Sequence, residues 1–218
     1  MQRCAQLFAT SIIVLALFLA TGCTSSKEAG FNSLFNGKDL AGWTYASKAG
    51  NGYAVADGAI YCTASDGGSL YTEKEYADFI FRFEFKLTQN ANNGVGIRAP
   101  LQGDAAYVGM EIQVLDDSGP DYKSLRPEQY HGSIYDVFAA KRGSLKPVGE
   151  WNEEEITAKG RRVTIKLNGN IIVDANLDDV KDEAKLKKHP GLANTKGHIG
   201  FLGHGTRVEF RNLRIKEI

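Results

Sequence analysis

The chain contains little cysteine, with only Cys4, Cys23 and Cys62 in 218 residues. If the segment that carries Cys4 is removed and Cys23 is acylated, Cys62 is the one thiol left in the mature protein. An internal disulfide is then excluded. The folded domain therefore does not depend on an oxidising compartment.

Long apolar runs are also missing, because the run at residues 12–20 is too short to span a membrane as a helix. It follows Arg3 and ends in small residues directly before Cys23, which is typical of a bacterial lipoprotein signal; an ordinary secretory signal is the alternative. We expect a signal peptide at 1–22 and an acylated tether at 23–30. The protein would then be lipid-anchored in the bacterial cell envelope, periplasmic or at the outer-membrane surface, and would contact the membrane through its lipid.

An excess of charge of one sign is absent, since 26 Lys and Arg balance 26 Asp and Glu. No basic block interrupts this balance, which argues against nucleic acid as a partner. Phosphate-binding glycine loops, zinc-ligand spacings and a nucleophilic serine elbow are missing as well. These absences exclude several common classes of enzyme and leave the residues below as the candidates for chemistry.

Helical periodicity is nearly absent, and turn signals recur roughly every ten residues. The alternation of apolar and polar residues predicts many short strands, with one helical candidate at 178–188. The predicted strands lie at 53–56, 59–63, 79–87, 107–116, 162–167, 171–174, 197–202 and 207–216. We therefore expect one all-β domain at 31–218, a two-sheet β-sandwich or jelly roll with at most one short surface helix.

Residues 107–116 sort into two faces when they are read with a period of two. One face is apolar: Val108, Met110, Ile112 and Val114. The other face carries an aromatic ring, a glycine without a side chain, a carboxylate and an amide: Tyr107, Gly109, Glu111 and Gln113. A second strand repeats the design, with Val95, Ile97 and Ala99 opposite Gly94, Gly96 and Arg98. Such faces fit a groove that handles carbohydrate.

Four groups on or near this groove could carry chemistry. Glu111 could be a general acid or base, or a surface carboxylate paired with an arginine. His204 stands between two glycines and could exchange protons near neutral pH, or be a turn residue without a role. Arg98 could donate hydrogen bonds to sugar oxygens or neutralise Glu111. His131 could reach the groove, with Tyr135 on the same face.

The segment from Glu111 to Asp116 resembles the Glu-x-Asp-x-x-Glu signature of one class of retaining glycosidases. In that class, two carboxylates flank the scissile bond as nucleophile and acid. Here Gln113 occupies the middle position, and Asp116 falls on the opposite face of a regular strand from Glu111. The pattern therefore disfavours ordinary retaining hydrolysis.

Several segments, in their order and spacing, resemble the 3-keto-disaccharide hydrolase domain family. They are residues 34–43, 93–98, 109–116, 149–152, 167–169, 197–205 and 208–212. The resemblance implies a concanavalin-like jelly roll in a secreted bacterial lipoprotein. It also implies cleavage of glycosides that are already oxidised at C3, with Glu111, Arg98 and His204 as site residues.

The implied reaction needs no pair of glycosidase carboxylates. A ketone at C3 acidifies the proton on C2, so the aglycone at C1 can leave by elimination, and water then adds to the enone. Glu111 and His204 would be base and acid in either order, and Tyr135 would assist proton transfer. Arg98 and Gln113 would hold the C3 oxygen and the adjacent hydroxyl, and Tyr107 and His131 would contact the sugar. No cofactor is required, although a divalent metal that polarises the ketone stays open.

Two other classes of function use the same surface. A non-catalytic, lectin-like lipoprotein would bind an oligosaccharide by stacking it on Tyr107 and Tyr135. A structural lipoprotein would use the groove as a subunit interface. Turnover of an oligosaccharide or glycoside substrate would distinguish the enzyme from both.

Overall fold

The computed structural model describes residues 29–46, 52–63 and 67–218. The expected signal peptide and Cys23, the expected site of acylation, lie outside the described residues. Among the residues described, no helix is both long and apolar enough to cross a membrane.

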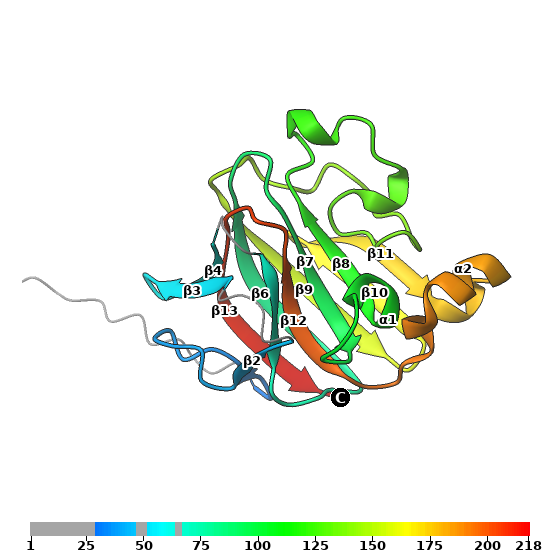
Figure 1. Cartoon of the computed structure of the whole chain (residues 1–218), viewed down its shortest axis with the longest axis horizontal. Coiled ribbons are helices and arrows are strands. Elements are labelled where there is room, and N and C mark those ends of the chain that lie inside the picture. Colours follow the sequence, from blue (N-terminus) through cyan, green and yellow to red (C-terminus); the bar gives the residue numbers. More distant parts are fainter. Residues whose placement is uncertain (1–28, 47–51, 64–66) are drawn as a thin grey trace, which may run out of the picture.

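Two antiparallel sheets face each other, which confirms the predicted all-β sandwich (Figure 1). The larger sheet has the order β11-β10-β9-β6-β13-β4-β3, with β1 paired to β13. Its strands are β1 (Asn32–Ser33), β3 (Tyr53–Ala56), β4 (Ala59–Cys62), β6 (Phe79–Leu87), β9 (Trp151–Lys159), β10 (Arg162–Leu167), β11 (Asn170–Asn176) and β13 (Val208–Glu217). The smaller sheet has the order β2-β5-β12-β7-β8. Its strands are β2 (Trp43–Tyr45), β5 (Gly68–Thr72), β7 (Asn92–Ala99), β8 (Met110–Leu115) and β12 (His198–Gly203).

The core lies between the sheets and is built from the alternation seen in the sequence. On β6 the odd-numbered residues Phe79 to Leu87 are buried, and the residues between them are half-buried. Phe201 of the smaller sheet stacks on Phe210 of the larger, with ring centroids 3.9 Å apart, and on Trp43. Aromatic contact across the layers therefore fixes how the two sheets pack.

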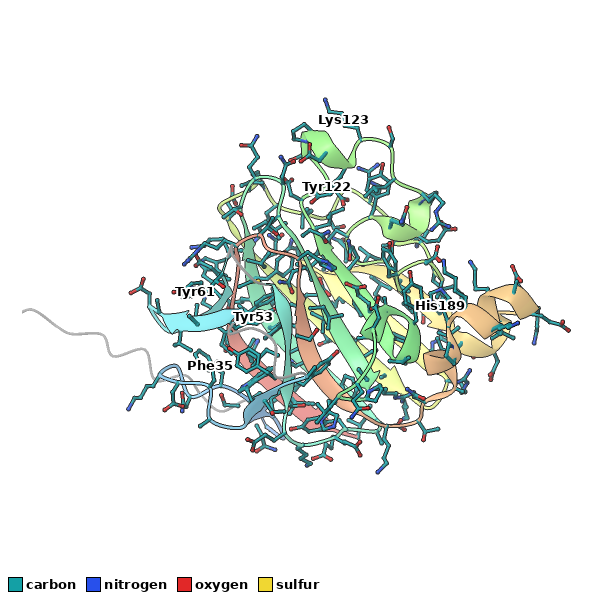
Figure 2. All side chains as sticks on the ribbon, viewed as in Figure 1. Phe35, Tyr53, Tyr61, Tyr122, Lys123 and His189 are labelled. Carbon is teal, nitrogen blue, oxygen red and sulfur yellow. The ribbon has the colours of Figure 1, made fainter. Side chains whose placement is uncertain are left out.

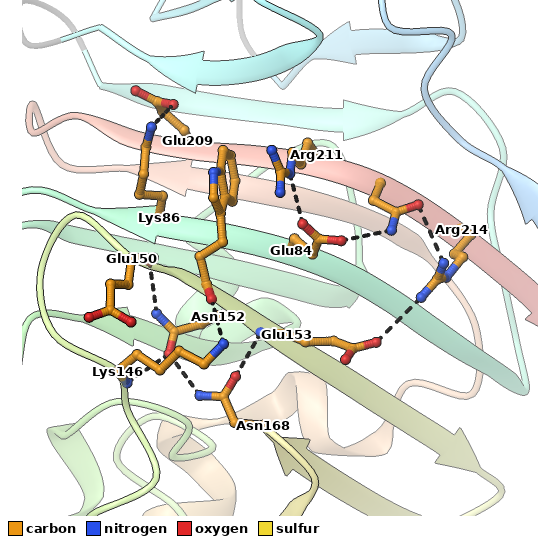
Figure 3. A network of polar contacts seen from close by, with 12 residues as sticks. Glu84, Lys86, Lys146, Glu150, Asn152, Glu153, Asn168, Glu209, Arg211 and Arg214 are labelled. Carbon is orange, nitrogen blue, oxygen red and sulfur yellow. Dashed lines mark hydrogen bonds and ion pairs between the residues drawn. The ribbon is translucent and has the colours of Figure 1, made fainter. Parts of the chain in front are cut away.

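The outer face of the larger sheet carries pairs of opposite charge (Figure 3). Arg211 pairs with Glu84 at 2.7 Å, and Lys86 pairs with Glu209 at 2.8 Å. The Arg211 guanidinium also lies 3.9 Å from the ring centroid of Trp151. Such half-buried pairs, which stay in contact with solvent, each stabilise the fold by about 1 kcal/mol. The charged side chains of this face are therefore paired with one another. Trp151 lies on this larger sheet, away from the strands that form the predicted groove.

The part of the chain that the structure describes contains two short α-helices, α1 (Ala105–Val108) and α2 (Glu183–Lys188), so the expectation of at most one helix is wrong. Four 3-10 turns complete the described elements: η1 (Pro120–Tyr122), η2 (Pro127–Gln129), η3 (Leu177–Asp179) and η4 (Pro190–Ala193). The extra helix is α1, which takes Tyr107 out of the predicted strand. The Asp104 carboxylate accepts the N–H of Ala106 and caps this single turn. The strand begins only at Met110.

The predicted helix at 178–188 forms over its second half alone. The Asp182 carboxylate accepts the N–H groups of Ala184 and Lys185, so the helix begins after this cap. Pro190 follows the last turn and opens η4 instead.

The outer edge of β8 is paired with the segment 132–135 rather than open. The backbone N–H of Gln113 donates to the carbonyl of Ser133 at 3.0 Å, and the backbone N–H of Gly132 donates to the backbone carbonyl of Gln113 at 2.8 Å. The amide of Tyr135 donates to the carbonyl of Glu111 at 2.9 Å. This pairing fixes the Tyr135 backbone beside Glu111.

Arg98 does not reach the groove, which corrects its predicted position. The register between β7 and β12 shifts next to Arg98, whose φ of 47° turns the side chain away from the strand's regular alternation. Its buried guanidinium donates to the carbonyls of Ala77 at 3.0 Å and Gly160 at 2.8 Å, and to the Asp78 carboxylate at 2.9 Å. Arg98 thus ties the end of β7 to the turn between β9 and β10 of the other sheet.

We expect Arg98→Met to lower the free energy of unfolding by about 1.5–3 kcal/mol, because it removes the hydrogen bonds that a buried guanidinium donates to Ala77, Gly160 and Asp78. Arg162→Met is the matched control, since Arg162 pairs with Asp174 on the exposed surface. It should cost less than about 1 kcal/mol. Urea unfolding of both variants measures the difference, and equal small losses would contradict the role given to Arg98.

Candidate active site

A cavity of about 180 Å³ opens on the outer face of the smaller sheet, over β7 and β8. It is lined by Asn92, Asp104, Ala106, Tyr107, Glu111, Gln113, Leu115, Tyr122, Leu125, Gln129, Tyr135 and His204. The structure therefore brings together five of the predicted site residues: Tyr107, Glu111, Gln113, Tyr135 and His204. Arg98 and His131 do not line this cavity.

Glu111 is buried in the wall of the cavity with only 5% of its surface exposed. Its Oε1 atom has no hydrogen-bond partner among the described residues. The side chain lies over Gly94 of β7, where an added Cβ would come within 2.0 Å of Oε1. Gly96, which is directly opposite Glu111 in the register, has room for a methyl group. The glycine at position 94 therefore makes the space that this carboxylate occupies.

His204 lies in the turn after β12, and half of its side chain is exposed. Gly205 follows with a φ of +76°, which lets the chain bend around the imidazole. The His204 Nε2 is 3.8 Å from Glu111 Oε1, within reach of an ion pair but too long for a hydrogen bond. The interaction with the Glu111 carboxylate raises the pKa of His204 above its ordinary 6.5. The pair thus favours an imidazolium facing a carboxylate.

Hydroxyl and amide groups line the wall beside this pair. The Gln129 amide donates to the Tyr135 hydroxyl at 3.0 Å, which leaves the hydroxyl proton available to a ligand. The Gln113 amide donates one hydrogen to Asn92 at 3.2 Å and has a second one to offer. The cavity therefore presents hydrogen-bond donors close to a carboxylate and an imidazole.

Tyr107 lines the cavity from α1 and is supported from behind. The ring of His189 lies 5.1 Å from the Tyr107 ring, and Lys188 Nζ lies 5.5 Å from it. Asp136 accepts from Lys188 and is paired with Arg126. Burial alone would raise the pKa of Asp136, but the hydrogen bonds from Lys188, Arg126 and His189 lower it to about 2. The ionised Asp136 carboxylate therefore holds Lys188 and His189, the two side chains that pack against the Tyr107 ring.

His131 lies between the sheets and not in the groove, which corrects its predicted position. Its Nδ1 accepts the N–H of Leu115 at 3.2 Å, and its Nε2 lies 3.2 Å from Glu154 Oε2. His131 and Tyr135 would share a face only in an extended strand, but Gly132 has a φ of +76° and turns the chain. The imidazole therefore points into the core while Tyr135 stays at the cavity.

Four further residues that line the cavity were not predicted from the sequence: Asn92, Asp104, Tyr122 and Gln129. Asp104 has a local signal as the cap of α1, but only the fold shows what it faces. Tyr122 comes from the long connection after β8, whose path no periodicity predicts (Figure 2). Within the described ranges, no group of three or more His, Cys, Asp and Glu residues is placed to hold a metal ion.

Residues 30–216 match the family model of the 3-keto-alpha-glucoside-1,2-lyase-like domain, so the chain belongs to this family. The chain is 27% identical to a 3-keto-disaccharide hydrolase of Bacteroides thetaiotaomicron, with 86% of this chain and 78% of the relative covered. A candidate glycosyl hydrolase from Parabacteroides distasonis has a similar structure, with a TM-score of 0.75 at 25% identity over 86% of this chain and 99% of that one. A Bacillus subtilis protein of galectin-like fold aligns with a TM-score of 0.57 at 14% identity, over 80% of this chain and 89% of its own. That last likeness supports the jelly-roll class.

We expect Gly94→Ala to lower the free energy of unfolding by about 1–3 kcal/mol, because the new methyl group collides with the Glu111 carboxylate. The displaced carboxylate should also move away from His204. Gly96→Ala is the matched control on the same strand, since its methyl group would meet only ordinary contacts. Thermal unfolding compares the two, and an equally stable Gly94→Ala variant would contradict the packing described.

We expect NMR titration of the His204 ring to give a pKa above 6.5 that falls when Glu111 is replaced by glutamine. As the pH rises, His204 should therefore lose its proton at a lower pH in Glu111→Gln than in the wild type. Glu75→Gln is the control, because Glu75 lies 3.8 Å from a different imidazole, that of His198. A His204 pKa unchanged by Glu111→Gln would contradict the pairing.

Proposed function

We propose that this protein is a carbohydrate-active enzyme that cleaves 3-keto-glycosides by elimination across C1 and C2 followed by hydration. The observation that carries the proposal is the pair of Glu111 and His204 in a cavity lined with hydroxyl and amide donors. Family membership and the 3-keto-disaccharide hydrolase relative support a hydrolase that acts on carbohydrate.

Glu111 is the base in this proposal. The Glu111 carboxylate, which lines the cavity, takes the proton from C2, and the electron pair of that C–H bond forms the C1–C2 double bond. The bond from C1 to the glycosidic oxygen breaks, and the departing oxygen takes a proton from the His204 imidazolium. The raised pKa of His204 suits it to be the acid, and the low exposure of Glu111 removes competing water from the base.

Tyr135 and Gln113 donate hydrogen bonds to the C3 oxygen, on which negative charge develops as C2 loses its proton. Both side chains are held by neighbours, through Gln129 and Asn92, so little reorganisation is needed when the charge appears. Water then adds to the enone, with hydroxyl bonding to C1 and a proton returning to C2. The net change is hydrolysis.

We also propose that the enzyme is attached to the bacterial cell envelope through lipid on Cys23. The support for this is the sequence alone, namely the short apolar run followed by small residues and a cysteine. Metabolic labelling with a fatty-acid analogue in wild type and Cys23→Ala tests it. Equal labelling of both would contradict the anchor.

The test of the reaction uses a chromogenic 3-keto-α-glucoside and its unoxidised parent, each with and without chelator. We expect release from the keto compound only, and a loss of about 10²–10⁴-fold in kcat/KM for Glu111→Gln and His204→Ala. Glu153→Gln, on the exposed outer face of β9, is the control and should keep wild-type turnover. Binding of unoxidised sugar with turnover of neither compound would instead favour the lectin-like function.

Deuterium exchange in heavy water separates the base from the acid. In His204→Ala, Glu111 still removes the C2 proton, so unreacted substrate should gain deuterium at C2 while release of the leaving group falls. In Glu111→Gln both exchange and release should fall. Normal exchange in Glu111→Gln would contradict the assignment of the base.

A further inference from the structure

A second cavity of about 210 Å³ lies next to the first. The two share three lining residues, Asp104, Glu111 and His204. The other residues of the second cavity are Ser69, Gly103, Ala105, Leu202 and Gly203. The carboxylate and the imidazole therefore stand where two spaces meet, each of a size that suits one sugar ring.

The chemistry of the two spaces differs. Aromatic side chains and the amide and hydroxyl donors line the first cavity, through Tyr107, Tyr122 and Tyr135 among others. The second cavity has small residues and a floor in which Ser69 of β5 faces Leu202 of β12 in the register. Its rim is formed by the exposed Gly103 and Asp104, so it opens to solvent. The tyrosine hydroxyl and amide donors, Tyr135 and Gln113, therefore lie on the side of the first cavity.

We propose that the second cavity is the subsite for the departing sugar of a 3-keto-disaccharide, with the keto ring in the first cavity. This inference rests on the proposed function. The keto ring must have donors at its C3 oxygen, which the first cavity supplies. The departing sugar needs only a place for its ring and acceptors for its hydroxyl groups, which the apolar Leu202 and the oxygens of Ser69 and Asp104 provide. The glycosidic oxygen then lies at His204.

Filling the second cavity should therefore discriminate between leaving groups. In Ser69→Phe we expect kcat/KM for a 3-keto-α-disaccharide to fall about tenfold or more. With the methyl 3-keto-α-glucoside, whose leaving group is only methanol, the value should stay within about twofold of wild type. Ser69→Leu fills less of the space and serves as a second variant. Thr157→Phe adds the same ring to the outer face of β9 and is the control.

Two kinetic outcomes would overturn the subsite. An equal loss on both substrates would mean that the second cavity holds the keto ring or supports the fold, and no loss on either would mean that the cavity stays empty. If wild type turns over neither compound, the proposed reaction fails, and binding of glucose by ligand-observed NMR still tests the subsite. Weaker glucose binding in Ser69→Phe than in Thr157→Phe would support it, and equal binding would overturn it.

Discussion

The candidate site depends on β8 being hydrogen-bonded along both of its edges. On one side it pairs with β7 in a regular antiparallel register, and on the other it pairs with the segment that carries Tyr135. A strand at the end of a sheet is otherwise free to twist or to pair elsewhere. Because both edges are paired, Glu111 and Gln113 stand at fixed heights above the sheet, with Tyr135 beside them. The positions of Glu111, Gln113 and Tyr135 are therefore set by backbone hydrogen bonds more than by contacts among their side chains.

The same strand must also serve the core, since its inner face buries Met110, Ile112 and Val114. Alternation in a strand then sends Glu111 to the outer face, where the neighbouring strand would normally place a side chain against it. Gly94 removes that side chain, and the carboxylate folds down into the space. A buried carboxylate is costly without a partner, and the imidazole of His204 supplies one across 3.8 Å. Gly94 therefore provides the space for the buried Glu111 carboxylate, and His204 provides its charged partner.

The sequence predicted the sheets and about half of the site because period-two alternation survives wherever strands are regular. It placed Glu111 and Gln113 on one face correctly, and the two glycines beside His204 marked an exposed imidazole. It failed where the backbone leaves the regular path. Arg98 follows a register shift, and His131 precedes a glycine with positive φ. Tyr107 lines the cavity as predicted, but from a helix and not from a strand, because a capped helical turn competes locally with the strand and short segments do not reveal which of the two forms.

The arrangement of carboxylates is what separates this site from an ordinary retaining glycosidase. Such an enzyme needs two carboxyl groups aimed at one glycosidic bond. Both oxygens of Asp116 are occupied by Ser118 and the amide of Asn90, and Asp104 holds the first turn of α1. Gln113 offers an amide where that class has an acid, and the group paired with Glu111 is the His204 imidazole, at 3.8 Å. In the proposed function, Glu111 with an imidazolium suits a substrate whose C2–H is acidified by a C3 ketone, because proton removal can then replace nucleophilic attack at C1.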